Sequence, residues 1–328
     1  MQAFEESSGK DAEEESRGSV FAFAGMGLLL LLTHVFALLL AAPFETAGMK
    51  AFENPESVFN AVFFFALVLC FTAAILVILK FGGMKFVHLF MLFAVAATIY
   101  WVLSALIPII LNIFHVASIP AFDIFPLIVA LALTALLYFR PEWYVIDAVG
   151  LLVASGVASI FGISLQVLPV IVLLVILAVY DAVSVYGTKH MVSLASSVVE
   201  MRVPLLFVLP RRRKFSLLKV GAAKGRAERA EKEEKVEKAG QEDGREQQEL
   251  GGGEAFFMGL GDAIIPAILA VSAYRYASFA SAIGSVAGTL TGYALLCTFA
   301  GRGKPHAGLP FLNSGAILGF LLGVSLGS

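Results

Sequence analysis

The sequence has few charged residues and only two cysteines, and both shortages narrow the class of protein. Asp, Glu, Lys and Arg make up 15% of the 328 residues, whereas 59% are hydrophobic, and the mean hydropathy is +0.87. A water-soluble domain has about 25% charged residues, so this composition indicates a membrane protein with several spans. Cys70 and Cys297 lie in separate apolar runs, which argues against a disulfide framework and a cysteine-based metal cluster. We expect both to be buried, small hydrophobic side chains.

Motifs of several other classes are also missing. The five histidines lack ligand-like spacing and no His-Glu-x-x-His occurs, so we expect no metal and no cofactor. The letters GVSLG at 323–327 match a serine nucleophile elbow, but no helix follows them, and packing glycines explain them better. A net charge of -2 gives no indication of a nucleic-acid partner. The N-terminus is polar and acidic where a signal peptide needs a basic start, so residues 1–18 are predicted to be a polar tail before a retained first span.

Long apolar runs predict an all-α polytopic membrane protein with nine transmembrane helices, because a bilayer core needs roughly 20 apolar residues in a helix. The predicted spans are Ser19–Ala42, Ser57–Leu79, Phe86–Ile113, Phe122–Phe139, Tyr144–Ser164, Val167–Tyr186, Glu254–Tyr274, Ser278–Ala300 and Pro305–Gly327. The fourth is short, and the boundary between the fifth and sixth rests on Gln166 and Pro169.

The distribution of Lys and Arg predicts the orientation. With the N-terminus in the cytoplasm, twenty-one of these residues fall in cytoplasmic segments and two, Lys50 and Arg275, fall outside. The C-terminus is then extracytoplasmic. The predicted organisation is a tail (1–18), six spans (19–187), a cytoplasmic connection (188–253) and three spans (254–328).

The connection at 188–253 changes composition along its length. Residues 191–210 are apolar but interrupted by Glu200, Arg202 and Pro204, which favours an interfacial or partly buried helix over another span. The basic run Arg211–Lys214 suits the anionic inner leaflet, so membrane lipids are expected partners. The rest is charged and nearly free of apolar residues, which predicts a disordered linker.

Small residues recur every four positions in three spans, a spacing that lets helix backbones approach closely in lipid. These stripes are Gly150, Ala154, Ala158 and Gly162; Gly284, Gly288 and Gly292; and Gly315, Gly319, Gly323 and Gly327.

Two carboxylates stand apart from the others. Asp123, Asp147 and Glu254 lie near predicted span ends, within reach of water or headgroups, but Asp181 and Asp262 lie inside their spans. An acid inside the membrane costs about 2.5 to 3.5 kcal/mol on insertion scales and is therefore a functional candidate. Counting residues from the span ends places both about 10 to 12 Å below the cytoplasmic edge, so a facing pair is plausible.

A facing pair suits aspartic proteolysis. Two close carboxyls in a low dielectric share one proton and titrate together. The ionised member then takes a proton from water, which attacks a peptide carbonyl, while the protonated member assists the oxyanion and the leaving nitrogen. Gly259 and Gly261, on either side of Leu260, lower the helix stability at the start of this span and leave room beside Asp262. Tyr180 is either a hydrogen-bond donor to Asp181 or a packing residue.

At these residues the chain resembles the presenilin and signal peptide peptidase family of intramembrane aspartyl proteases, as a prokaryotic, presenilin-like homologue. The resemblance rests on Tyr-Asp in VYDAVSVYG, on Gly-x-Gly-Asp in GLGD, and on nine spans with a hydrophilic sixth connection. It implies catalytic Asp181 and Asp262 and substrates that are transmembrane helices. The N-terminal orientation is similar to that of presenilins, which implies substrates with an extracytoplasmic N-terminus. Accessory subunits are not indicated.

The family's third signature, Pro-Ala-Leu, is only approximated. Ala307, Gly308 and Leu309 align with it, Leu309 alone is identical, and Pro310 matches the proline that often follows in presenilins. The resemblance implies that these four residues engage substrate in extended form, because a helical peptide bond is shielded by its own hydrogen bonds. Two alternatives remain at this point: a proton-coupled carrier or channel that uses the paired aspartates as a relay, and a proteolytically inert scaffold.

Overall fold

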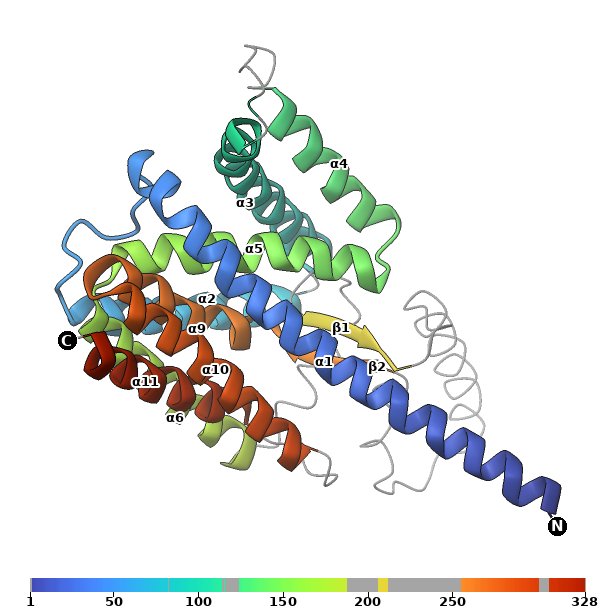
Figure 1. The fold of residues 1–328 in the computed structure, drawn as a ribbon. Coiled ribbons are helices and arrows are strands. Elements are labelled where there is room, and N and C mark those ends of the chain that lie inside the picture. Colours follow the sequence, from blue (N-terminus) through green and yellow to red (C-terminus); the bar gives the residue numbers. More distant parts are fainter. Residues whose placement is uncertain are drawn as a thin grey trace.

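The fold was determined as a computed structural model, which describes residues 2–81, 83–113, 115, 124–187, 206–211, 255–300 and 307–327. Nine helices and two strands make up this part of the chain (Figure 1). They are α1 (Gln2–Thr46), α2 (Phe59–Lys80), α3 (Met84–Ile113), α4 (Phe125–Phe139), α5 (Trp143–Ser164), α6 (Val167–Gly187), β1 (Leu206–Pro210), β2 (Ala255–Gly259), α9 (Leu260–Tyr276), α10 (Phe279–Ala300) and α11 (Gly308–Gly327).

The predicted helices are present with small shifts at their ends. Among the described residues, seven helices are long and apolar enough to cross a membrane; α4 has 15 residues and α9 has 17. The first apolar stretch, Gly18–Thr46, is longer than predicted, and the helix itself continues back to Gln2 through the polar tail. Helices suit these sequences because each pairs its own backbone groups inside the bilayer.

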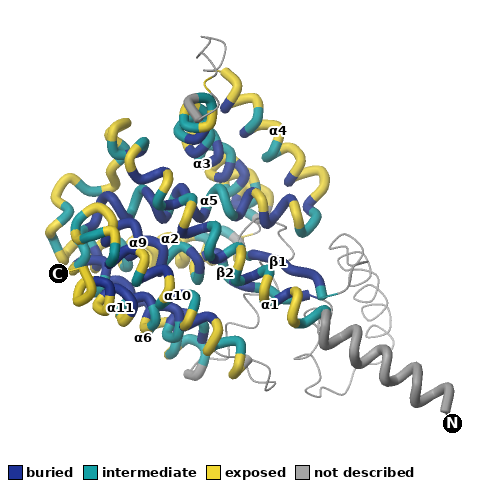
Figure 2. The backbone as a smooth tube through the Cα atoms, in the orientation of Figure 1, coloured by how far each residue is buried: buried dark blue, intermediate teal, exposed yellow. Residues whose placement is uncertain are grey.

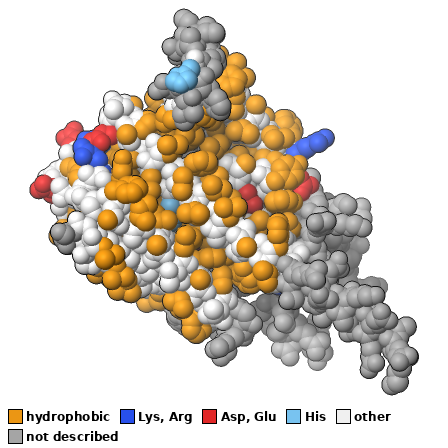
Figure 3. Space-filling model, in the orientation of Figure 1, with side chains coloured by type: hydrophobic (Ala, Val, Ile, Leu, Met, Phe, Trp, Pro, Cys, Tyr) orange, Lys and Arg blue, Asp and Glu red, His pale blue; other side chains and the backbone are white. Residues whose placement is uncertain are grey.

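The outer surface is apolar, as a membrane protein requires. Hydrophobic side chains cover most of the face drawn in Figure 3, and the few charged groups there lie mainly toward its margins. Figure 2 shows buried residues on the inward sides of the helices and exposed ones on the outward sides. Cys70 is on the exposed side of α2, so the prediction that it is buried was wrong, whereas Cys297 is partly buried.

Helix α5 lies in the middle of the bundle and packs against α1, α3, α9 and β1 (Figure 1). Its small residues permit this. Ala154 and Ala158 are fully buried, and a Cβ added to Gly162 would collide with the Val271 side chain of α9. The predicted stripe on this helix is therefore a packing surface for α9.

Helices α10 and α11 form the most extensive helix pair, and their glycine stripes face each other. A Cβ added to Gly284 would collide with the backbone of Gly319, and one added to Gly288 would collide with the backbone of Gly315. The predicted close approach of helix backbones is confirmed.

A two-stranded sheet is the main departure from the prediction. Strand β1 pairs antiparallel with β2, with Leu206 opposite Gly259 and Pro210 opposite Ala255. Residues 206–210 are thus a buried strand, not the end of an interfacial helix. The seventh predicted span was also wrong at its start, because its first residues form β2 and the helix begins only at Leu260. Apart from 206–211, the predicted connection, like Asp123 and Glu254, lies outside the described residues.

Candidate active site

Asp181 lies in the last two turns of α6 and its side chain is buried. The backbone N–H of Leu309, in the first turn of α11, donates a hydrogen bond to Asp181 Oδ2 with an N–O distance of 3.1 Å. The start of α11 therefore binds Asp181 through one of the unpaired N–H groups that every helix start presents.

Asp262 lies in the first turn of α9, directly after β2. Gly259 is the N-cap, with extended backbone angles (φ −60°, ψ 137°), so the chain changes there from strand to helix. The side chain is partly exposed. The predicted helix start at Glu254 was therefore wrong: the helix begins at Leu260, and Asp262 is its third residue.

The two aspartates converge on the start of α11. A Cβ added to Gly308 would lie 3.2 Å from Asp262 Oδ2 and 3.7 Å from its Oδ1, while the same segment binds Asp181. The two carboxyl groups also interact electrostatically. Helices α6, α9 and α11 pack against one another, so three segments distant in sequence bring together the two predicted acids and the predicted substrate segment.

The residues predicted around Asp262 have distinct surroundings. Leu260 is buried and forms part of an apolar cluster with Phe207. A Cβ added to Gly261 would meet nothing nearer than Ile265 Cδ1, at 4.0 Å, and one added to Gly259 would meet Asp262 Oδ2 at 3.5 Å. Space beside the acid is thus open at Gly261, whereas a side chain at Gly259 would touch the Asp262 carboxyl group.

Ala307, Gly308, Leu309 and Pro310 form the entry into α11, with Ala307 and Leu309 buried and the other two partly exposed. Asn313, one turn later, fixes this helix start to α6, because its Nδ2 donates a 2.9 Å hydrogen bond to the Leu174 carbonyl. The sequence analysis missed Asn313. A polar amide inside an apolar run was the available signal, since such groups hydrogen-bond between helices in membranes.

Tyr180 packs against a neighbouring helix. Its ring meets Phe65 of α2 edge to face with centroids 5.7 Å apart, and its side chain is 44% exposed. Of the two roles left open from the sequence, these contacts favour packing.

Asp147 is a further acid whose surroundings differ from our expectation. We placed it at a span end within reach of water, yet it is 6% exposed, because β1 covers it. Its Oδ1 accepts a 2.7 Å hydrogen bond from the Val208 N–H.

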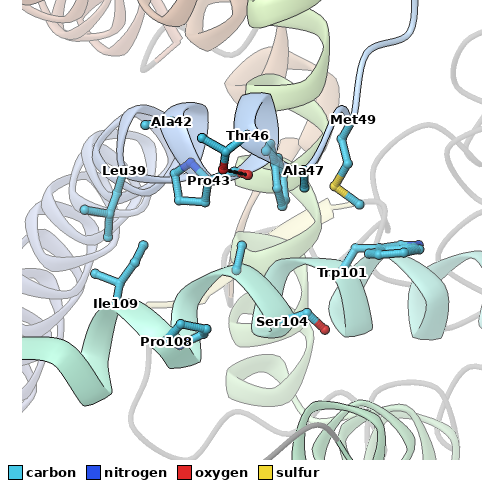
Figure 4. Close-up of a pocket in the computed structure, with 12 residues that line it drawn as sticks. Leu39, Ala42, Pro43, Thr46, Ala47, Met49, Trp101, Ser104, Pro108 and Ile109 are labelled. Atoms are coloured by element: carbon cyan, nitrogen blue, oxygen red, sulfur yellow. Dashed lines mark hydrogen bonds between the residues drawn. The ribbon is translucent and has the colours of Figure 1, made fainter. Parts of the chain in front are cut away.

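A cavity of about 700 Å³ lies away from the aspartates, between the end of α1 and the C-terminal half of α3 (Figure 4). Its lining is mostly apolar and includes Leu39, Met49 and Trp101, with Pro43 and Pro108 one on each helix. None of the predicted site residues lines it, so this cavity is separate from the acid pair. Among the described residues, no three His, Cys, Asp or Glu side chains are grouped so that they could hold a metal ion.

Comparison with known proteins supplies independent information. The family model described as signal-peptide peptidase, presenilin aspartyl protease matches residues 26–327. A solved presenilin family intramembrane aspartate protease in space group C222 is 37% identical with a TM-score of 0.65, over 93% of this chain and 99% of that chain. A presenilin family intramembrane aspartate protease in space group P2 is 39% identical with a TM-score of 0.63, over 92% and 97%. No curated protein sequence matches.

Proposed function

The chain belongs to the signal-peptide peptidase and presenilin family of intramembrane aspartyl proteases, and we propose that Asp181 and Asp262 are its catalytic pair. It is an integral, multi-pass membrane protein that acts on transmembrane substrates. The observation that carries the assignment is the start of α11, where the Leu309 N–H binds Asp181 and Gly308 lies beside Asp262. A peptide bound at this helix start lies beside both carboxyl groups.

The proposed chemistry follows from the closeness of the two acids. Two carboxyl groups that interact in a low dielectric hold one proton between them. The ionised member removes a proton from a water molecule, and the resulting hydroxide attacks the scissile carbonyl carbon. The protonated member donates a hydrogen bond to the developing oxyanion. Breakdown of the tetrahedral intermediate returns a proton to the departing nitrogen and restores the shared proton.

Asp181 and Asp262 have different surroundings, which gives them different roles in this proposal. The Leu309 N–H of α11 already binds Asp181, and a hydrogen bond of this kind stabilises the ionised form of a carboxyl group. We therefore assign the resting negative charge to Asp181 and the shared proton to Asp262.

Substrate is proposed to bind as an extended segment. The register of the sheet supports this. The Val208 N–H points away from β2, to Asp147, so Val208 and the opposite residue Phe257 form a pair without hydrogen bonds between them. The backbone N–H and C=O of Phe257 therefore point away from β1, toward the other edge of β2. That edge continues into Gly259 and Asp262. A substrate strand placed along it would meet the acids next to Ala307–Pro310.

The finer topology is also part of the proposal. We propose that α4 and α9, although short, cross the membrane with the other seven helices, giving nine spans. The excess of Lys and Arg supports a cytoplasmic N-terminus and 188–253 connection, with the C-terminus outside. Substrates would then have an extracytoplasmic N-terminus, and anionic lipids would contact the basic cluster Arg211–Lys214.

A cleavage assay tests the catalytic assignment. The purified protein in lipid nanodiscs is incubated with a synthetic transmembrane peptide, and products are identified by mass spectrometry. We expect Asp181→Asn and Asp262→Asn each to lower the rate by at least 10³-fold, because an amide can neither hold nor accept the shared proton. Glu53→Gln is the control, since it neutralises an exposed acid outside the site.

The same variants separate the protease from a carrier. Full cleavage by either aspartate variant contradicts the assignment of that residue. Proton flux in liposomes, lost in both aspartate variants while no peptide is cleaved by the wild type, would instead favour the relay.

A further inference from the structure

Asp147 is a buried acid that the proposed chemistry does not use. It lies in the second turn of α5, is 6% exposed, and accepts the 2.7 Å hydrogen bond from the Val208 N–H. An acid buried among membrane helices is costly and marks a functional feature by default. Its partner is informative, because Val208 is the central residue of β1.

The bond joins α5 to the free edge of the sheet. Strand β1 pairs with β2 on one side only, and Asp147 occupies the other side. Without an acceptor there, the Val208 N–H would be buried next to an apolar helix with no partner. The side chain of Asp147 thus sets the height at which β1, and with it β2, lies along α5.

A second contact on the same face of α5 supports this arrangement. Gly150 follows Asp147 by three residues and therefore lies next to it on the helix surface. A Cβ added to Gly150 would be 3.2 Å from Phe207 of β1 and also 3.2 Å from Leu260 of α9. The first residue of α9 and the strand β1 are therefore both seated on α5 within one turn of Asp147.

We propose that Asp147 is a positioning residue for catalysis, which fixes the β1–β2 sheet on α5 and thereby the place at which α9 starts and presents Asp262. This inference rests on the proposed catalytic role of Asp262. The path is short. Asp147 binds Val208, Val208 lies opposite Phe257, and Asp262 follows Phe257 by only five positions. The edge of β2 proposed to bind substrate is fixed by the same bond.

The test combines amide exchange with steady-state kinetics on the full chain in nanodiscs. Asp147→Leu removes the acceptor while keeping the branched shape and the number of heavy atoms, and Asp147→Asn restores a neutral acceptor at the same length. Ser272→Ala is the matched control, since it removes another buried hydrogen bond, from Ser272 to the Leu165 carbonyl at 2.8 Å, near the far end of α9. The rate is expressed per folded molecule, and cleavage positions in the transmembrane peptide are mapped.

We expect Asp147→Leu to exchange β1 amides at least tenfold faster and to lower kcat by about 10- to 100-fold, because a displacement of about 1 Å at a catalytic group has this effect. Asp147→Asn should recover kcat to within about threefold, and Ser272→Ala should leave both kcat and β1 exchange unchanged. If Asp147→Leu does not fold, Asp147→Glu takes its place: it keeps the acceptor but lengthens the side chain by one methylene, and should lower kcat or shift the cleavage position.

Two results overturn the inference. In the first, Asp147→Leu has the kcat and the cleavage positions of the wild type; the same result in Asp147→Glu counts equally if that variant is used instead. The other is a loss of kcat in Asp147→Asn as large as in Asp147→Leu. Asp181→Asn and Asp262→Asn, measured in the same series, distinguish a failure of the positioning role from a failure of the catalytic assignment. If these two variants abolish cleavage while Asp147→Leu leaves it intact, only the positioning role of Asp147 fails.

Discussion

Replacing Gly288 by alanine should separate α10 from α11 and slow catalysis at a distance. A Cβ at Gly288 would collide with the Gly315 carbonyl oxygen, would lie 2.8 Å from the carbonyl carbon, and would lie 3.0 Å from Gly319 Cα. Ordinary contact for such a carbon begins at about 3.4 Å, so α11 must move by roughly 0.6 Å or more. All three atoms belong to backbone and cannot rotate away.

Two opposing effects decide the outcome for stability. Alanine in a helix interior is favoured over glycine by about 1 kcal/mol. Overpacking typically costs about 1 to 3 kcal/mol, and here it involves two rigid backbones. The difference is a net destabilisation of about 0 to 2 kcal/mol, and we expect the upper part of this range, seen as a lower thermal midpoint, because both backbones are rigid.

The effect on cleavage follows from the position of α11. This helix begins at Gly308 and carries the Leu309 N–H that binds Asp181. A shift of about 0.6 Å or more at the acid pair should lower kcat by roughly tenfold or more. Gly27→Ala on α1 is the control, since its methyl would meet only the Tyr293 ring, at 3.2 Å, and a side chain can yield. If Gly288→Ala has the wild-type kcat at a temperature at which the variant is fully folded, this reasoning is refuted.

Three further predictions concern the acids and one surface ion pair. The cleavage rate should have a bell-shaped pH dependence, because Asp181 and Asp262 need one shared proton: full protonation removes the base at low pH, and full ionisation removes the acid at high pH. A rate that still rises at pH 9 would count against the pair. Leu309→Pro removes the backbone N–H that binds Asp181 at a helix position that tolerates proline, so kcat should fall about tenfold, whereas Leu309→Ala, which keeps the N–H, should stay within about threefold. Equal rates in the two variants would show that this hydrogen bond is dispensable. Arg275→Gln breaks the 2.7 Å ion pair with Glu45, but both side chains are partly exposed, so the loss of stability should be below about 1 kcal/mol by thermal unfolding; a larger loss would mean that this pair holds α1 to α9.

Much of the helical fold could be predicted from the sequence because the bilayer imposes a simple length rule. Apolar runs of about 20 residues gave helices whose ends agree with α5, α6 and α10 to within one residue. The glycine stripes of α10 and α11 were also informative, since four-residue spacing places glycines on one helix face.

The sheet could not be predicted in the same way. Residues 255–259, AFFMG, form a short apolar run that does not distinguish a strand from buried helix, and the pairing partner is more than forty residues earlier. Because β2 was read as helix, the depth of Asp262 was counted from the wrong residue. The burial of Asp147 was missed for the same reason: it depends on β1, which covers it only in the folded chain.

The acids themselves were predictable, because a carboxylate within an apolar span costs insertion free energy and is therefore a functional candidate. The contact that joins them was not. Nothing in the spacing of Ala307–Pro310 indicates that Leu309 binds Asp181 while Gly308 lies beside Asp262, since that depends on how α11 packs against α6 and α9.

The most direct test is a structure of the protein bound to a peptide transition-state analogue with a central hydroxyl group. The account predicts that carboxyl oxygens of Asp181 and Asp262 both lie within about 3.2 Å of that one hydroxyl, with the peptide extended beside Gly308 and Leu309. An analogue held elsewhere, or a hydroxyl within reach of only one of the two aspartates, would contradict it.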